Sequence, residues 1–131
     1  MTLEDRRGAV LITGASTGIG AACALHLDTL GFRVFAGVRK ESDSATLKAK
    51  ASERLSTVLV DVTDAASIEG AKNTITKAIG DLGLAGLVNN AGISVNAPLE
   101  FVPIDLLRKQ FEVNVTGQIA VTQAFMDMIR A

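Results

Sequence analysis

The sequence predicts an α/β protein in which helices cover both faces of a parallel β-sheet. Four short apolar runs have the continuous character of strands that are buried on both faces. Helical or charged segments separate these runs, which is the order expected of βαβ units. The chain has 131 residues, and a domain typically holds about 100–200. We therefore expect one domain over residues 1–131 and exclude two.

The first expected strand, residues 9–12, opens directly into a glycine-rich turn and a helix. The strand reads Ala-Val-Leu-Ile, and residues 13–20 read Thr-Gly-Ala-Ser-Thr-Gly-Ile-Gly. Gly31 is placed to end the helix in the left-handed conformation. The predicted buried face of this helix has apolar residues at helical spacing: Ile19, Cys23, Leu27 and Leu30.

Two further strands and a capped helix follow. Residues 33–38 form the second expected strand, residues 39–54 a charged loop with a weakly patterned helix, and residues 57–62 the third strand. Asp64 is suited to cap the next helix, which residues 80–83 end. The face predicted for that helix is Ile68, Ala71, Ile75 and Ala78.

The fourth expected strand, residues 86–90, leads through a proline-bearing loop into a long final helix. The apolar stripe of that helix is Ile104, Leu107, Phe111, Val115, Ile119, Thr122, Met126 and Ile129. Right-handed crossovers make the whole a Rossmann-type doubly wound sheet with three α/β/α layers and strand order 3-2-1-4. Such folds continue to a fifth and sixth strand, so we expect an incomplete, N-terminal part. Leu87 and Val88 would then form an unprotected edge, which favours a homo-oligomer.

Charge and cysteine content narrow the function. Lys and Arg number 13 and Asp and Glu number 14, for a net charge of −1, and no basic stripe is present. We therefore expect a small-molecule ligand and no nucleic acid or membrane partner. The single cysteine excludes an intrachain disulfide and a cysteine-based zinc site, and no metal is expected. With no apolar leader at the N-terminus, the expected location is cytoplasmic.

The glycines at positions 14, 18 and 20 predict a phosphate-binding turn. A diphosphate at a helix N-terminus needs backbone without Cβ atoms nearby, and the helix dipole attracts its charge. The alternative is a tight strand-to-helix turn that binds nothing. The position of the turn, directly after a strand and at the start of a helix, favours the phosphate.

Two motifs together resemble the short-chain dehydrogenase/reductase family. They are Thr-Gly-Ala-Ser-Thr-Gly-Ile-Gly at residues 13–20 and Asn-Asn-Ala-Gly at residues 89–92. The similarity runs from about Gly8 to the last residue, and it is strongest to the branch that acts on retinol, hydroxysteroids and hydroxybutyrate. The resemblance implies an NAD(P)-dependent oxidoreductase that passes a hydride between nicotinamide and a carbonyl or secondary alcohol.

The resemblance also implies a role for particular residues. Four match the family's glycine turn: Gly14, Gly18, Ile19 and Gly20. Ser16 and Thr17 would meet the adenosine phosphate or ribose, and Asp61 and Val62 would hold the adenine ring. Three residues match the turn under the nicotinamide-side ribose: Asn90, Ala91 and Gly92. Read alone, Asp61 would be a carboxylate capping a turn at a strand end.

The end of the second strand bears on the choice of cofactor. NAD-preferring members carry an acid there, whereas this chain has Val38-Arg39-Lys40, whose charge suits a 2′-phosphate. We therefore expect NADP(H), with Arg39 as a contact. NAD(H) stays possible, because Thr17 stands where many NADP-binding members carry Lys or Arg.

The catalytic set implied by the resemblance is only partly present. Asn114 matches the asparagine of the family's catalytic tetrad, although a core asparagine bonded to backbone would explain it equally well. The family's serine, tyrosine and lysine have no counterpart, and the chain holds no tyrosine at all. We expect the chain to stop before the fifth strand and the Tyr-x-x-x-Lys helix, and to be inactive alone. The alternative is a catalytically inactive nucleotide-binding or interaction module.

Overall fold

Four parallel strands form one sheet in the computed structural model, which describes residues 7–131. The strands are β1 (Ala9–Ile12), β2 (Arg33–Val38), β3 (Leu55–Leu59) and β4 (Gly86–Val88). Their order in the sheet is β3-β2-β1-β4, which confirms the predicted Rossmann-type order. Each connection between consecutive strands contains a helix, as the alternation of apolar runs and helical segments indicates.

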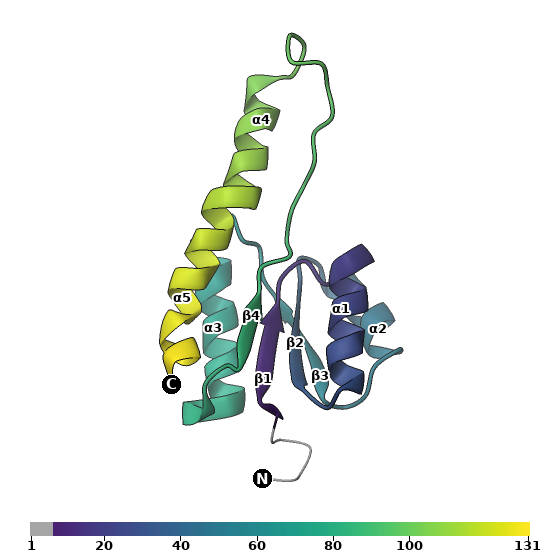
Figure 1. Ribbon diagram of the computed structural model, residues 1–131, viewed down its shortest axis with the longest axis vertical. Helices are drawn as coiled ribbons and strands as arrows, with labels where there is room; N and C mark the ends of the chain where they lie inside the picture. The colour runs from purple at the N-terminus through teal and green to yellow at the C-terminus, as the bar shows by residue number, and fades with distance from the viewer. Residues whose placement is uncertain (1–6) are drawn as a thin grey trace.

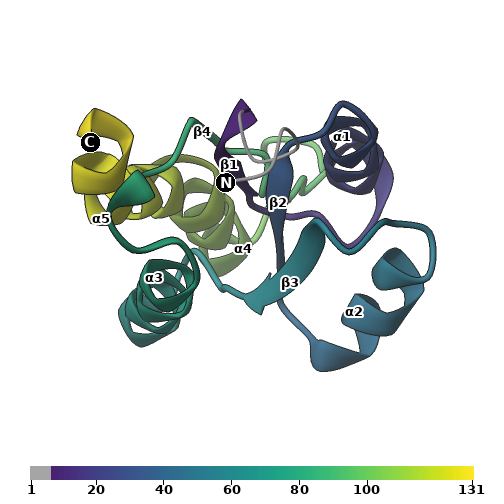
Figure 2. The same cartoon turned by 90° about the horizontal axis from the view of Figure 1, so that it is seen from below.

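Helices cover both faces of the sheet (Figures 1 and 2). One face carries α1 (Gly18–Thr29) and α2 (Glu41–Lys48), and the other carries α3 (Ala65–Ile79) and α5 (Gln118–Arg130). A short 3₁₀ turn, η2 (Gly80–Leu82), follows α3. The last helix is continuous but has three parts: α4 (Ile104–Phe111), a π-helical segment η3 (Glu112–Gly117), and α5. Its α4 end rises beyond the sheet beside the loop from β4 (Figure 1).

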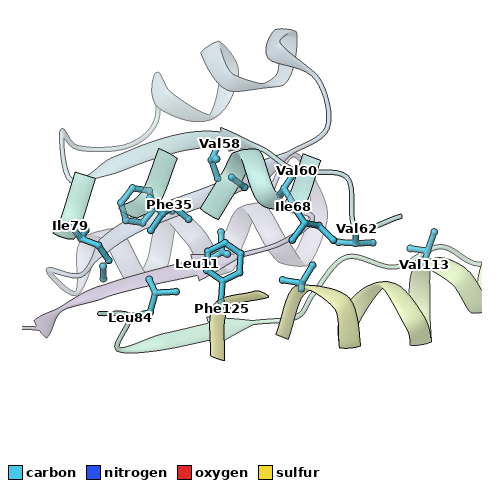
Figure 3. Close-up of a cluster of buried hydrophobic side chains, with 14 residues drawn as sticks. Leu11, Phe35, Val58, Val60, Val62, Ile68, Ile79, Leu84, Val113 and Phe125 are labelled. Carbon is cyan, nitrogen blue, oxygen red and sulfur yellow. The ribbon is translucent and has the colours of Figure 1, made fainter. Parts of the chain in front are cut away.

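Two hydrophobic clusters lie between the layers, one on each face of the sheet. Neighbouring strand residues point to opposite faces, so Leu11 packs towards α3 and α5 while Ile12 packs towards α1. Figure 3 shows the larger cluster, which includes Leu11 of β1, Ile68 of α3 and Phe125 of α5. Leu11, Ile12 and Phe125 are fully buried. The continuous apolar runs are therefore explained by burial on both sides.

Two strands, β3 and β4, have boundaries that differ from those expected. β3 begins at Leu55, two residues before the expected Thr57, because Leu55 is buried and pairs with Val34. It ends at Leu59 and not at Val62. β4 ends at Val88 and not at residue 90, because the Asn90 amide turns back to donate to the Val88 carbonyl at 3.1 Å.

The buried faces of two helices also differ from those expected. Ile19 and Leu30 of the face predicted for α1 are 82% and 41% exposed. The face that is buried consists of Gly20, Ala24 and Asp28. It is narrower than the predicted face, which lets α1 lie close to the sheet. In α3, Ile79 takes the place predicted for Ala78, while Ile68, Ala71 and Ile75 are buried as expected. Asp64 does cap α3, accepting from Ala66 N and Ser67 N.

The stripe predicted for the last helix faces away from the core. Five of its residues are exposed: Ile104, Phe111, Val115, Ile119 and Ile129. A second apolar stripe with a regular spacing of four packs against the sheet instead: Val113, Gly117, Val121 and Phe125. Because both stripes have helical spacing, periodicity alone does not decide between them. None of the helices within residues 7–131 combines the length and apolar character that crossing a bilayer requires.

A buried carboxylate ties α1 to the start of β3. Asp28 is 3% exposed and accepts hydrogen bonds from both the backbone amide and the hydroxyl of Ser52. Arg54 donates to the Asp28 carbonyl at 2.8 Å, and its guanidinium lies 3.7 Å from the carboxylate. Asp28 is therefore a polar residue on the buried face of α1, where the sequence predicted apolar residues. Its hydrogen-bond partners offset the cost of burying the carboxylate.

Removal of this carboxylate should destabilise the fold. Asp28→Ala leaves the Ser52 amide and hydroxyl without their acceptor and removes the negative charge beside the Arg54 guanidinium, and should lower the free energy of unfolding by about 3 kcal/mol. Chemical denaturation of the purified chain measures it. Asp127→Ala, at an exposed position on α5, is the control and should stay within about 0.5 kcal/mol. Equal effects of the two substitutions would contradict the assignment.

Candidate functional site

A cavity of about 290 Å³ lies at the carboxyl ends of the strands, where the sheet order reverses between β1 and β4. In open α/β sheets this is the position at which ligands bind. Eleven of the residues singled out in the sequence line the cavity: Gly14, Ser16, Thr17, Ile19, Gly20, Arg39, Asp61, Val62, Asn90, Ala91 and Gly92. Gly18 and Asn114 are outside the lining. Four further residues complete it: Val60, Ile93, Lys109 and Val113.

The three glycines of the turn serve different purposes. A Cβ on Gly20 would lie 2.1 Å from the Gly14 carbonyl oxygen, and one on Gly14 would lie 2.8 Å from the Ala91 Cα. These two glycines therefore let the turn after β1 pack against the turn after β4. Gly18 has a φ of +59°, and a Cβ there would have no atom within 4 Å. Open space at Gly18 is thus available to a ligand.

The N-terminus of α1 faces this space without a side-chain cap. Thr17 is the N-cap residue, has extended backbone, and makes no capping hydrogen bond with its hydroxyl. The first turn of α1 carries no acidic residue. The free amides and the helix dipole therefore give the turn a positive electrostatic character that suits an anion.

Thr13 links the two turns that form the floor of the cavity. Its hydroxyl accepts hydrogen bonds from the Asn90 and Ala91 amides at 3.1 and 3.0 Å, and its side chain is 1% exposed. The Asn90 side chain donates in return to the Gly14 carbonyl at 3.0 Å. Sequence reasoning treated Thr13 only as part of the glycine motif. Its position at the end of a buried strand was the signal that could have identified it.

Asp61 is an ionised acceptor on the cavity wall. Its carboxylate accepts from the Thr63 amide at 2.9 Å and from the Thr63 hydroxyl at 2.7 Å, and these two bonds are the main reason why its pKa is lowered. Partial burial opposes this shift, while the positive charges of Lys109 and Arg39 add to it. Lys109 was not foreseen, although it precedes the buried Val113 by one helical turn.

The Thr63 hydroxyl should control the acidity of Asp61. Thr63→Val removes one of the two hydrogen bonds and should raise the Asp61 pKa towards its ordinary value of about 3.9. Because the folded-state pKa is lowered, this carboxylate stabilises the fold above its ordinary pKa, and the contribution is lost as pH falls through the lowered value. NMR titration of the Asp61 carboxyl carbon measures the shift. Thr63→Ser keeps the hydroxyl, so identical titration of the two variants would contradict the assignment.

Asn114 lies in η3 and binds the backbone of the loop that follows β4. Its amide accepts from Ile93 N at 2.8 Å and donates to Ile93 O at 2.7 Å. This is the backbone-bonded asparagine that the sequence left open as one of two interpretations. Asn114 does not line the cavity itself, but it holds the backbone of Ile93, which does.

Comparison with known proteins identifies the family. The family model described as short chain dehydrogenase matches residues 8–131. The chain belongs to the short chain dehydrogenase family. The chain is 45% identical to mouse (Mus musculus) estradiol 17-beta-dehydrogenase 2 over 126 residues, which are 93% of this chain and 33% of that protein. Mouse retinol dehydrogenase 7 is 40% identical, over 98% of this chain and 40% of its own length.

A solved structure has the same architecture over the part that it shares with this chain. NADPH-bound carbonyl reductase from chicken fatty liver superposes with a TM-score of 0.85 at 31% identity, covering 92% of this chain and 47% of that chain. The two mouse relatives support placement in the retinol and hydroxysteroid branch. The chain spans about a third to two fifths of the length of these curated relatives.

Proposed function

We propose that this chain is the nucleotide-binding part of an NAD(P)-dependent oxidoreductase that passes a hydride between nicotinamide and a carbonyl or secondary alcohol. The observation that carries the proposal is the convergence of the glycine turn, Asp61 and the turn of residues 90–92 on one cavity. The substrate would be a small-molecule alcohol or ketone. The names of the two mouse relatives, which refer to estradiol and retinol, support this class of substrate. A homo-oligomer, a cytoplasmic location and a single domain over residues 1–131 stay predictions.

The residues present fit a dinucleotide. Open space at Gly18 and the uncapped α1 N-terminus would hold the diphosphate, with Ser16 and Thr17 beside it. Gly14, Ile19 and Gly20 would form the rest of that wall. The ionised Asp61 would accept from the adenine amine, next to Val62. When bound, the nicotinamide would supply the hydride chemistry.

The other end of the cavity would receive the nicotinamide-side ribose. Asn90, Ala91 and Gly92 form its wall, held in place by the Thr13 hydroxyl. Asn114 would contribute by fixing Ile93 and, in a complete site, by taking part in the proton relay.

NADP(H) is the cofactor that the charges favour. Arg39 and Lys109 both line the cavity, so a ligand with an additional phosphate would meet two cations there. The carbonyl reductase of similar structure is described as NADPH-bound, which supports this preference. NAD(H) stays possible because Thr17, a neutral side chain, also lines the cavity.

A catalytically inactive nucleotide-binding or interaction module is the second candidate. The observation that favours it is the lack of any tyrosine in the 131 residues, since the family's proton donor is a tyrosine. Both candidates predict that this chain alone turns over no substrate. They differ in whether the coding sequence continues past Ala131 into a Tyr-x-x-x-Lys helix.

The phosphate role of the glycine turn can be tested with a control that is matched for backbone strain. Gly18→Ala places a methyl group in the open space at the α1 N-terminus and should weaken NADPH binding about tenfold. Gly31 lies at the other end of α1, also at positive φ, and its Cβ would make only ordinary contacts. Gly31→Ala should therefore leave the affinity unchanged in calorimetric titration. Equal losses in both variants would refute the phosphate role.

Arg39 should distinguish the two cofactors. Arg39→Ala removes a cation that would face the 2′-phosphate, and should weaken NADPH binding about tenfold while leaving NADH binding nearly unchanged. Lys48→Ala, at an exposed position on α2 outside the cavity, is the control. Titration of each variant with both cofactors measures the ratio. Equal binding of the two cofactors, unaltered by Arg39→Ala, would exclude the NADP(H) preference.

A further inference from the structure

Three amide side chains on one face of the last helix bind the backbone of the segment that follows β4. Gln110 accepts from the Val95 amide at 2.7 Å. Asn114 binds both the amide and the carbonyl of Ile93, at 2.8 and 2.7 Å. Gln118 donates to the Ala91 carbonyl at 3.3 Å. We call these three side chains the amide ladder.

The spacing of the ladder matches an extended chain. Four residues of a helix rise about 6.0 Å, and two residues of an extended chain span about 6.6 Å, so every fourth helix residue meets every second residue of the segment. Burial of the segment alternates accordingly: Ala91, Ile93 and Val95 are half-buried, while Gly92 and Ser94 are exposed. The three side chains of the helix thus form hydrogen bonds with the backbone of residues 91–95, as a neighbouring strand would.

The π-helical segment keeps the ladder straight. In an α-helix each residue turns about 100°, so residues four apart drift by about 40° and three amides would spread over about 80°. A π-helix has more residues per turn and turns less with each one, which opposes this drift. Asn114 lies within η3, between the other two amides. Gly117 allows η3 to approach the segment that follows β3, because a Cβ there would lie 2.8 Å from the Val62 side chain.

The ladder lies directly behind the cavity wall. Ala91, Gly92 and Ile93 line the cavity, and two of them accept or donate a ladder hydrogen bond. We propose that Gln110 and Gln118 are positioning residues, which together with Asn114 hold residues 91–95 in the course that the nicotinamide-side ribose requires. The proposal rests on the proposed function, since it concerns the same nucleotide site.

The two glutamines have opposite hydrogen-bonding roles, which allows a sharp test. The partner of Gln110 is an N–H donor, so Gln110 acts as an acceptor. A carboxylate at position 110 would accept the same hydrogen bond. The partner of Gln118 is a carbonyl, so Gln118 acts as a donor, and a carboxylate would lose the bond and repel the carbonyl oxygen. The same substitution, Gln→Glu, should therefore be tolerated at position 110 and harmful at position 118.

Nucleotide titration of the purified chain tests the positioning role. Gln110→Ala, Gln118→Ala and Gln118→Glu should each weaken NADPH binding about fivefold, the effect of one lost hydrogen bond. Gln110→Glu should restore wild-type affinity. Adenosine 2′,5′-bisphosphate, which lacks the nicotinamide half, should bind all variants equally. If NADPH binds the wild type and all four variants alike, or if both Gln→Glu variants behave alike, the positioning role is wrong.

Hydrogen exchange provides a readout that needs no ligand. The Val95 amide should exchange about fivefold faster in Gln110→Ala than in the wild type and in Gln110→Glu. If the exchange rate of the Val95 amide is the same in all three proteins, the amide ladder is wrong, even if nucleotide binds. If neither nucleotide binds the wild type, the proposed function fails, and the exchange result alone then upholds or overturns the ladder.

Discussion

The close approach of two turns, one after β1 and one after β4, is the constraint on which the site depends. The two strands are neighbours at the point where the sheet order reverses, so their following turns must cross the same small space. Gly14 and Gly20 leave no Cβ in that space, and the buried Thr13 hydroxyl satisfies two amides there. Without this packing, the glycine turn and the Asn90 turn would not share one cavity wall.

The strands and the site were predictable because both follow from topology. A run such as Val34–Val38 is apolar without alternation only if both faces are buried, which implies the parallel sheet. Parallel strands end on one side of the sheet, so the residues just past each end must gather there. Asp61 and Asn90, which the family resemblance implied, and Arg39, which the charge after the second strand indicated, accordingly line one cavity.

The helix faces and the support of the site were not predictable in the same way. Two apolar stripes with helical spacing run along the last helix, and the spacing alone does not show that the stripe with Val121 and Phe125 is the buried one. Asp28 looks like a surface residue until Ser52 and Arg54 are brought to it by the fold. Lys109 acts electrostatically on Asp61, and Gln110 binds the Val95 amide, and polar residues on a helix carry no periodic signal for such distant partners.

The two ends of the cavity are built by different physical means. At the end proposed to take the adenosine, charged side chains line the cavity: Asp61 is held in its charged form by Thr63, and Arg39 and Lys109 stand near it. At the other end the wall is backbone, and the neutral amides of the last helix fix its course. Ionic contacts weaken as salt screens them, whereas the geometry of a hydrogen-bonded backbone wall does not depend on ionic strength. Salt should therefore weaken the proposed hold on the phosphates without altering the wall proposed to receive the nicotinamide-side ribose.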